Sequence, residues 1–159
     1  MRLGVISDTH GLLRDEVVNK LEGCDYIIHA GDIGGEEIFE RLNKIARTFV
    51  VRGNNDGDSW GMKLPYYKEI EMDQVLIYVV HKKDDIPFEL GEVDLVIYGH
   101  SHKYSEEKKD GVIYLNPGSC GKKRFSLPLT MAIVEVNIDR VDITKIDLEG
   151  WLYYHNKVI

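Results

Sequence analysis

Residues of the types that bind metal ions follow five short apolar runs of the chain. The runs cover residues 3–6, 26–29, 49–51, 75–80 and 95–98. Within a few positions of their ends come the candidate ligands Asp8, His10, Asp32, Asn54, His81, His100 and His102. Because the carboxyl ends of strands in an open α/β sheet meet at one crevice, we expect these side chains to lie together. Glycines at positions 31, 53 and 99 suit sharp turns there.

These candidates form a set of oxygen and nitrogen donors without a thiolate. Two carboxylates, four imidazoles and one amide oxygen exceed the four ligands that a single Zn²⁺ takes in a protein. The set instead suits two divalent ions about 3.5–4 Å apart, with one carboxylate shared between them. Ser7, Ser101 and Ser119 show no Ser–His–Asp arrangement, so we do not expect a covalent serine intermediate.

Each candidate has a simpler explanation when it is taken alone. Asp8 and Asp32 could cap the helices that follow them, since aspartate is a favoured N-cap residue. His81 and His100 could be ordinary histidines at strand ends, and Asn54 a turn residue. Metal binding explains all five strand ends together, whereas the simpler explanations need a coincidence at each one.

The elements that must position these residues differ between the two halves of the chain. Residues 12–21 and 36–46 carry apolar side chains at helical spacing, so the first half is ordered strand–helix–strand–helix–strand. This order is typical of a parallel sheet. The pattern of the second half predicts a region rich in strands. We expect two stacked sheets with helices outside.

Turn signals divide the second half into hairpins. They lie at residues 73–74, 110–111 and 137–140, and Asp110–Gly111 is the strongest of them. A short helix is predicted over residues 87–90. In the last strand, over residues 141–148, the apolar alternation changes phase, which predicts a bulge near residues 144–145.

Length and charge limit the class of protein. The 159 residues predict a single domain over 1–159. With 20 Lys and Arg against 27 Asp and Glu, the formal net charge is −7, which argues against an extended nucleic acid or a membrane as partner. Cys24 and Cys120 form no CxxC motif or disulfide framework, so we expect a reducing, cytoplasmic location.

The residues around the candidate ligands resemble the signature of the calcineurin-like metallophosphoesterases. The motifs are DTH at 8–10, GD at 31–32, GNND at 53–56, His81 and GHSH at 99–102. NPGS at 116–119 extends the match toward the small YfcE-type phosphodiesterases. The resemblance implies two metal ions with the following ligands: Asp8, His10 and His102 for one, Asn54, His81 and His100 for the other, and Asp32 bridging both.

The resemblance also implies a fold and an activity. The fold is α/β, a four-layer α/β/β/α sandwich of two mixed sheets flanked by helices. The activity is that of a metal-dependent phosphodiesterase, in which a metal-bridging hydroxide attacks a small phosphate diester and Asp32 and Asn54 have catalytic roles. The alternative is a metal-binding scaffold of the same fold with little activity, as in the retromer subunit that resembles this family.

Family members use manganese, nickel, iron or zinc, and of these we expect manganese, although the donor set does not choose among them. Apart from the shared Asp32, the first set has a carboxylate where the second has the amide of Asn54. We therefore expect the second ion to be bound more weakly. Two divalent ions would change the formal charge from −7 to about −3 if no ligand gained or lost a proton.

Two positions depart from the family pattern. Larger relatives carry a histidine after the metal-binding asparagine, and here Asn55 and Asp56 follow instead. The general acid is therefore open, with Asp56 either a weak candidate or a turn residue. Lys82 and Lys83 follow His81 in place of Gly-His, either as solvated lysines or as positive charge for a second phosphate substituent.

Two further segments have alternative explanations. Arg124 ends a basic run after NPGS, and either reaches a phosphate beside a backbone anion nest or is simply exposed. The apolar tail at residues 151–154 either packs on the domain or forms a homodimer contact. His29 and His155 do not fit the ligand pattern.

Overall fold

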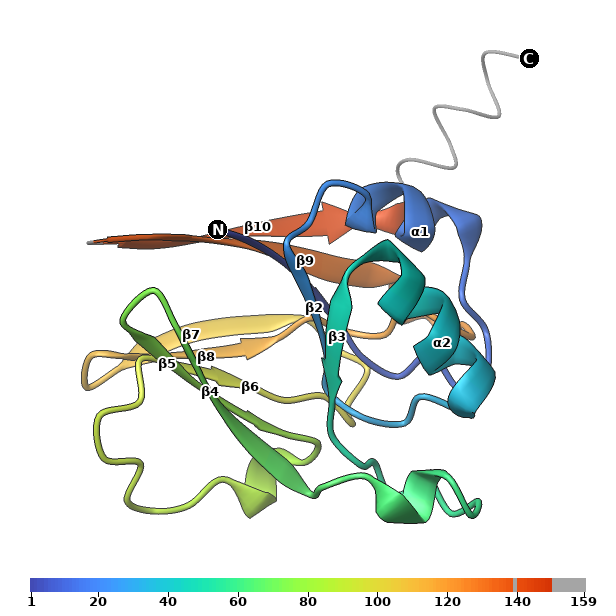
Figure 1. The fold of residues 1–159 in the computed structure, drawn as a ribbon, viewed down its shortest axis with the longest axis horizontal. Coiled ribbons are helices and arrows are strands. Elements are labelled where there is room, and N and C mark those ends of the chain that lie inside the picture. Colours follow the sequence, from blue (N-terminus) through green and yellow to red (C-terminus); the bar gives the residue numbers. More distant parts are fainter. Residues whose placement is uncertain (139, 150–159) are drawn as a thin grey trace.

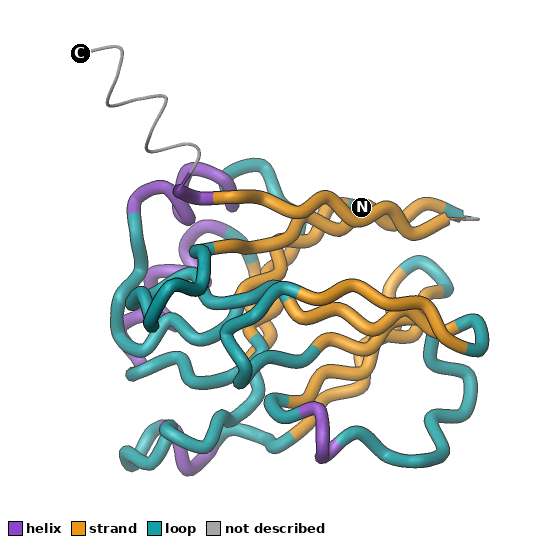
Figure 2. Tube along the Cα trace, turned by 180° about the vertical axis from the view of Figure 1, so that it is seen from behind, coloured by secondary structure: helices purple, strands orange, loops and turns teal. Residues whose placement is uncertain are grey.

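Two stacked five-stranded sheets form the centre of the molecule in the computed structural model, which describes residues 1–138 and 140–149 (Figure 1). The strand order is β10-β9-β1-β2-β3 in the first sheet and β4-β5-β6-β8-β7 in the second. Figure 2 shows the two layers of strands from behind, one above the other. Each sheet contains both parallel and antiparallel pairs, which confirms the predicted α/β class with two mixed sheets.

The first half of the chain builds the parallel part of the first sheet. β1 (Arg2–Ile6), β2 (Tyr26–His29) and β3 (Arg47–Val50) pair in parallel. They are connected by α1 (Asp15–Leu21) and α2 (Glu36–Ile45). The apolar faces of both helices pack against one side of this sheet, as the helical spacing of the sequence predicted.

The second half forms hairpins at the three predicted turns. The strands are β4 (Tyr67–Met72), β5 (Val75–Val80), β6 (Leu95–Ile97), β7 (Ser105–Lys109), β8 (Val112–Asn116), β9 (Thr130–Asn137) and β10 (Arg140–Asp147). Both residues of the Asp73–Gln74 turn and of the Asp110–Gly111 turn have positive φ, as two-residue hairpin loops favour. β9 then returns to pair antiparallel with β1, so the last hairpin completes the first sheet.

Apolar side chains from both sheets fill the space between them. Leu3 and Val5 of the first sheet share one buried cluster with Ile77, Leu95 and Ile97 of the second. This shared core fixes the two sheets relative to each other, and with them the loops that follow their strands.

The predicted helix over residues 87–90 is wrong. This stretch is irregular, and the nearby regular turn is the 3₁₀ helix η2 (Lys83–Asp85). Ile86 and Leu90 pack on the outer face of the second sheet, whereas Phe88 is fully exposed. Four residues are too few to form a stable helix without a packed face. This side of the molecule is therefore covered by a loop rather than by an α-helix.

The predicted bulge near residues 144–145 is also wrong. β10 pairs with β9 in one unbroken register from Arg140 to Asp147. Val141 and Ile143 pack into the core between the sheets, whereas Ile146 packs on the helix side of the same strand. The apolar alternation therefore shifts because the strand buries one face at its start and the opposite face at its end.

No helix in the described part of the chain has the length and apolar character needed to cross a membrane. The tail at residues 151–154 and His155 lie outside the described residues.

Candidate metal centre

The seven residues predicted as ligands lie in loops at the carboxyl ends of strands from both sheets. Asp8 and His10 follow β1, Asp32 follows β2 and Asn54 follows β3, whereas His81 follows β5, and His100 and His102 follow β6. Their donor atoms form two neighbouring groups. The stacking of the sheets thus brings together residues that are up to 94 positions apart in the sequence, from 8 to 102.

The first group consists of Asp8, His10 and His102, whose donor atoms all lie within 4.8 Å of one another. The two histidine Nε2 atoms are 3.3 Å apart. They lie 3.6 Å and 3.3 Å from Asp8 Oδ1. Among the described residues, Asp8 Oδ1 and His102 Nδ1 are the buried side-chain atoms without a hydrogen-bond partner. An unsatisfied carboxylate oxygen that faces imidazole nitrogens suits a bound cation.

The second group consists of Asp32, His81 and His100, again with donor atoms within 4.8 Å of one another. Asn54 joins it, because its Oδ1 lies 3.0 Å from His81 Nε2 and 3.0 Å from His100 Nδ1. His81 and Asp32 are buried, but Asn54 and His100 are exposed. The second group is therefore more open to solvent than the first.

His81 shows why a cation fits the second group. Its Nδ1 lies 2.7 Å from the carbonyl oxygen of Ala30, which can only accept, so Nδ1 carries a proton. In a neutral ring Nε2 is then an acceptor, yet it lies 3.2 Å from Asp32 Oδ2. Burial lowers the pKa of His81, but the hydrogen bond with Asp32 and the charge of Asp8 raise it overall. His81 Nε2 and Asp32 Oδ2 are thus two acceptors that face each other and attract a proton, and such a pair also suits a metal ion.

Asp32 lies between the two groups. Its Oδ2 is 3.2 Å from His81 Nε2 and 3.7 Å from His10 Nε2. The backbone N–H of Asn55 donates to its Oδ1 at 2.8 Å, and the Asn55 side-chain amide donates to its Oδ2 at 3.0 Å. Burial raises the pKa of Asp32, but the bonds with His81 and Asn55 outweigh it and bring the pKa to about 2. Asp32 is therefore ionised at neutral pH.

Asp8 is held ionised in a similar way. Burial alone would raise its pKa, but the imidazoles of His10 and His102 that face the carboxylate lower the pKa well below its usual range. Ser7 Oγ donates to Asp8 Oδ2 at 2.6 Å, and the backbone N–H of His100 donates to the same oxygen at 3.1 Å. Oδ2 is thus occupied, and Oδ1 is directed at the first group.

Neither aspartate caps a helix. α1 begins at Asp15 after Arg14, and α2 begins at Glu36 after Gly35, without a side-chain cap bond in either case. The simpler explanation of Asp8 and Asp32 as N-caps is therefore excluded.

The loops that carry the predicted ligands have an unusual backbone. Five of the seven predicted ligands adopt positive φ between 46° and 72°, and these are Asp8, His10, Asp32, His100 and His102. Positive φ is uncommon for residues other than glycine, and such strain clusters at functional sites. The two loops of the first sheet support each other, since the N–H of Asp8 donates to Gly31 and that of His10 to Asp32.

Two of the motif glycines are required by close approach rather than by a sharp turn. A Cβ on Gly53 would lie 2.1 Å from Asp32 Oδ1, and one on Gly99 would lie 2.1 Å from Ser7 Oγ. Neither has positive φ, in contrast to Gly31. The expected sharp turn is therefore found at Gly31. At Gly53 and Gly99 glycine is needed because a side chain would clash with neighbouring atoms.

Asp56 is a structural carboxylate. It is buried, and its oxygens accept hydrogen bonds from the backbone N–H groups of Asp32, Ile33, Gly34 and Gly53 at 2.8–3.2 Å. These four donors occupy both carboxylate oxygens as acceptors, so neither oxygen is free to donate a proton to a leaving group. Asp56 joins the loop of Asp32 to the loop of Asn54, which supports the turn-residue interpretation.

Three further polar residues fix the loops, a role that the sequence alone did not indicate. Asn116, fully buried, donates through Nδ2 to the Gly99 carbonyl and to Ser101 Oγ, both at 3.0 Å. Ser119 Oγ donates to the Asp8 carbonyl at 3.1 Å, and Ser7 holds the Asp8 carboxylate. Their signal was position: Ser7 adjoins a candidate ligand, and Asn116 and Ser119 begin and end the NPGS motif.

His29 lies outside both groups. The N–H of Gly31 donates to its Nδ1 at 3.1 Å, so Nε2 carries the proton and donates to Thr9 Oγ1 at 2.9 Å. Complete burial lowers the pKa of His29 to about 3, so the ring is neutral. Its role is to connect the loops after β1 and β2.

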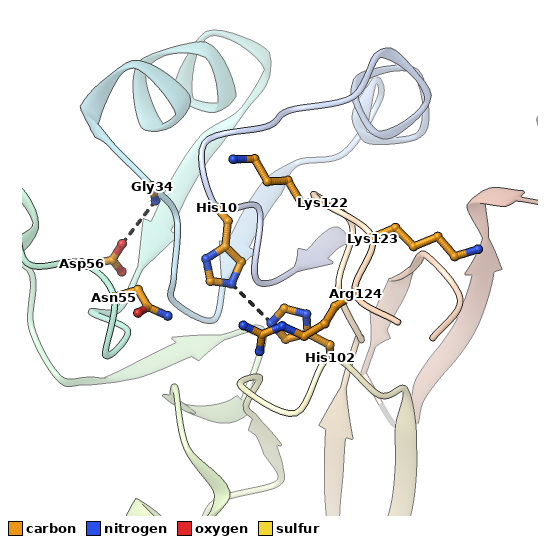
Figure 3. Close-up of a pocket in the computed structure, with 8 residues that line it drawn as sticks. All are labelled: His10, Gly34, Asn55, Asp56, His102, Lys122, Lys123 and Arg124. Carbon is orange, nitrogen blue, oxygen red and sulfur yellow. Dashed lines mark hydrogen bonds between the residues drawn. The ribbon is translucent and has the colours of Figure 1, made fainter. Parts of the chain in front are cut away.

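A cavity of about 480 Å³ opens beside the first group (Figure 3). It is lined by His10, Gly34, Asn55, Asp56, His102, Lys122, Lys123 and Arg124. The predicted anion nest of the NPGS turn is weakened, because the N–H of Gly118 donates to Asn116 Oδ1 and that of Cys120 to the Ser7 carbonyl. The basic side chains after the turn nevertheless reach the cavity.

Lys82 and Lys83 lie beside the second group. Both line a cavity of about 500 Å³ with His100, and Lys82 also lines one of about 270 Å³ with Asn54 and His81. Lys83 Nζ stands over the ring of Tyr98, 5.9 Å from its centre. Lys82 is therefore the nearer candidate for a role at the second group.

Comparison with known proteins identifies the family. Residues 1–139 match the model of the calcineurin-like phosphoesterase superfamily domain. A phosphodiesterase of Methanocaldococcus jannaschii is 31% identical over 143 residues, which covers 76% of this chain and 84% of that protein. The phosphodiesterase YfcE of Escherichia coli is 24% identical over 165 residues, covering 87% of this chain and 89% of that protein.

The fold is also found in a protein that is not named as a phosphodiesterase. The crystal structure of wild-type Vps29 from Entamoeba histolytica, complexed with Zn²⁺, superposes with a TM-score of 0.71. It is 23% identical in sequence, and the match covers 93% of this chain and 99% of that one. At this level of identity the likeness concerns the fold.

Proposed function

This chain belongs to the calcineurin-like phosphoesterase superfamily, and from that premise we propose that it is a binuclear metal-dependent phosphodiesterase acting on a small phosphate diester. The observation that carries the proposal is the convergence of seven oxygen and nitrogen donors from five strand ends into two adjoining groups. The proposed domain is the whole chain.

We assign one divalent ion to each group of donors. The proposed ligands are Asp8, His10 and His102 for the first ion, Asn54, His81 and His100 for the second, with Asp32 shared. Support comes from the unsatisfied Asp8 Oδ1 and from the position of Asp32 Oδ2 between His10 and His81. The donor set suits manganese, our preferred ion, and equally nickel, iron or zinc.

When bound, the two ions would supply a hydroxide nucleophile at neutral pH and hold a phosphoryl oxygen. The chain's own contribution is orientation. Asn55 fixes both oxygens of Asp32, and the Ala30 carbonyl fixes the ring of His81 with Nε2 facing the site. Such outer partners keep the ligands in place and set their tautomers.

The leaving group receives no evident help from the residue after Asn54. Asn55 is committed to Asp32, and Asp56 is committed to four backbone donors. The reaction should therefore favour leaving groups of low pKa, such as nitrophenolate, which depart without a proton.

The fold likeness to Vps29 raises a second candidate, a metal-binding scaffold with little activity. Such a protein would bind two ions and hydrolyse nothing. The seven donor side chains, their outer hydrogen bonds and the adjoining cavity favour the enzyme.

The proposal is tested by assaying bis(4-nitrophenyl) phosphate beside 4-nitrophenyl phosphate, after chelation and after adding back Mn²⁺, Ni²⁺, Fe²⁺ or Zn²⁺ singly. We expect hydrolysis to prefer the diester, to be lost on chelation and to return with metal. Asp32→Ala should lower the activity by more than about 100-fold, because even outer partners of a metal site contribute 10–100-fold. Activity that survives both treatments would exclude the mechanism, and two bound ions without hydrolysis would favour the scaffold.

A further inference from the structure

Two basic side chains point into the cavity beside the first group, and the proposed chemistry does not use them. Figure 3 shows Lys122 and Arg124 extending toward His10, whereas Lys123 between them extends the opposite way. Lys123 Nζ forms an ion pair with Glu149. All three residues line the cavity, but only Lys122 and Arg124 direct their charged ends toward His10, whereas the Lys123 ammonium is engaged by Glu149.

The structure fixes where this basic segment begins. Cys120 is fully buried, and its N–H donates to the Ser7 carbonyl. Gly121 packs so tightly on the loop after β1 that a Cβ there would lie 2.1 Å from the Thr9 carbonyl oxygen. Arg14 Nε donates to the Gly121 carbonyl at 2.8 Å. Lys122 and Arg124 therefore extend from an anchored point next to the ligands Asp8 and His10.

A charge count shows that these cations exceed what the proposed diester needs. Two divalent ions, when bound, would offset the carboxylates of Asp8 and Asp32, a hydroxide nucleophile and a singly charged diester. Of the charged residues that line the cavity, Lys123 is paired with Glu149, so Lys122 and Arg124 then remain, opposed by Asp56. The surplus is positive, and an anionic group on the substrate would neutralise it.

Resting on the function proposed above, we propose that this cavity is a subsite for a second phosphate group of the substrate. Arg124 and Lys122 are the residues that select it. The planar guanidinium of Arg124 can donate two parallel hydrogen bonds to phosphate oxygens, and the Lys122 ammonium adds a point charge. A volume of about 480 Å³ lies in the range of small-ligand sites, large enough for a sugar phosphate beside the metal centre. The preferred substrates are phosphodiesters that carry an additional phosphate monoester.

The experiment compares two substrates that differ by one phosphate. They are thymidine 5′-(4-nitrophenyl phosphate) and the same compound with a 3′-phosphate, assayed on the metal-loaded protein. We expect the ratio of their kcat/KM values to favour the 3′-phosphorylated compound by about tenfold or more, as a charged hydrogen bond provides. Arg124→Ala should remove most of that ratio and Lys122→Ala part of it. Lys123→Ala, which removes the same charge from the neighbouring position, should leave the ratio unchanged.

Equilibrium binding gives a second readout that does not depend on turnover. Calorimetry on the metal-loaded protein should show thymidine 3′,5′-bisphosphate binding about tenfold more tightly than thymidine 5′-phosphate. Arg124→Ala should remove most of this difference, and Lys123→Ala should keep it. Circular dichroism confirms that each variant is folded.

The outcomes separate this inference from the function on which it rests. If the plain diester is not hydrolysed with any metal, the proposed function fails, and the bisphosphate binding still tests the subsite. If it is hydrolysed but the wild type shows no preference, the subsite is refuted. An equal loss in Lys123→Ala and Arg124→Ala would also refute it, because it would indicate a general surface field.

Discussion

The two groups of donors at the proposed metal centre differ in both charge and exposure. The first group has the carboxylate of Asp8, which is fully buried, and His102, which is nearly so. The second has the amide of Asn54 in the corresponding place, and both Asn54 and His100 are exposed. A buried charge acts through a lower effective dielectric constant than an exposed one. The difference in charge and the difference in exposure therefore both favour tighter cation binding at the first group.

From this difference we expect the two proposed ions to be bound with unequal affinity. Asp32 contributes to both groups, so their difference arises from the remaining ligands. We expect a metal titration of the chelated protein to give two separate affinities, the tighter one at the first group. Two equal affinities would contradict the comparison.

Removing the charge of Asp8 should have the largest effect. Asp8→Asn keeps the shape of the side chain but removes the charge of a buried carboxylate. The lost attraction between this charge and the metal ion is about 4 kcal/mol, so the affinity of the tighter site should fall about a thousandfold. Calorimetric titration with Mn²⁺ measures this directly. If the tight site persisted, the first group would not depend on Asp8.

Cutting the link between two ligand loops should come next. Asp56→Ala leaves backbone N–H groups of Asp32, Ile33, Gly34 and Gly53 without their acceptor and should lower the free energy of unfolding by about 3 kcal/mol. The matched control is Asp58→Ala, which removes a single bond from the N–H of Gly61. Urea denaturation compares the two variants. Equal losses would show that Asp56 is not the link between the loops.

Adding a charge to the second group should reduce the asymmetry. Asn54→Asp places a carboxylate where the amide oxygen faces His81 and His100. Because the position is exposed, we expect a gain of about 2 kcal/mol, or about thirtyfold in the weaker affinity. The same calorimetric titration with Mn²⁺ measures the weaker affinity, and the tighter affinity serves as the internal control. An unchanged weak affinity would mean that exposure alone sets the difference.

The smallest effect is expected from an outer partner of the first group. Ser7→Ala removes the hydrogen bond to Asp8 Oδ2 and should weaken the tighter affinity about tenfold, while the weaker one stays unchanged. Ser59→Ala, at an exposed position, serves as control. Equal weakening of both affinities would show that Ser7 supports the whole centre rather than the first group.

Local patterns predicted the elements where one short stretch decides the structure. The helices over 15–21 and 36–45 follow from apolar spacing, and the Asp73–Gln74 and Asp110–Gly111 turns follow from residues that accept positive φ. The helix over 87–90 and the bulge near 144–145 failed because packing against distant elements decided both. Ile86 and Leu90 pack on the second sheet without a helix, and β10 buries one face at each end.

The sequence by itself determined which atoms are available to bind a metal, because residue type and position after a strand fix the chemistry of each donor. It also determined the family, through motifs that need no structure to be recognised. Only the tertiary structure decided how those donors divide, since their distances depend on the core that joins two sheets. The same holds for Asp56, Asn116 and the direction of Lys122, Lys123 and Arg124. Their partners lie on other loops, and no local pattern records which way a side chain turns.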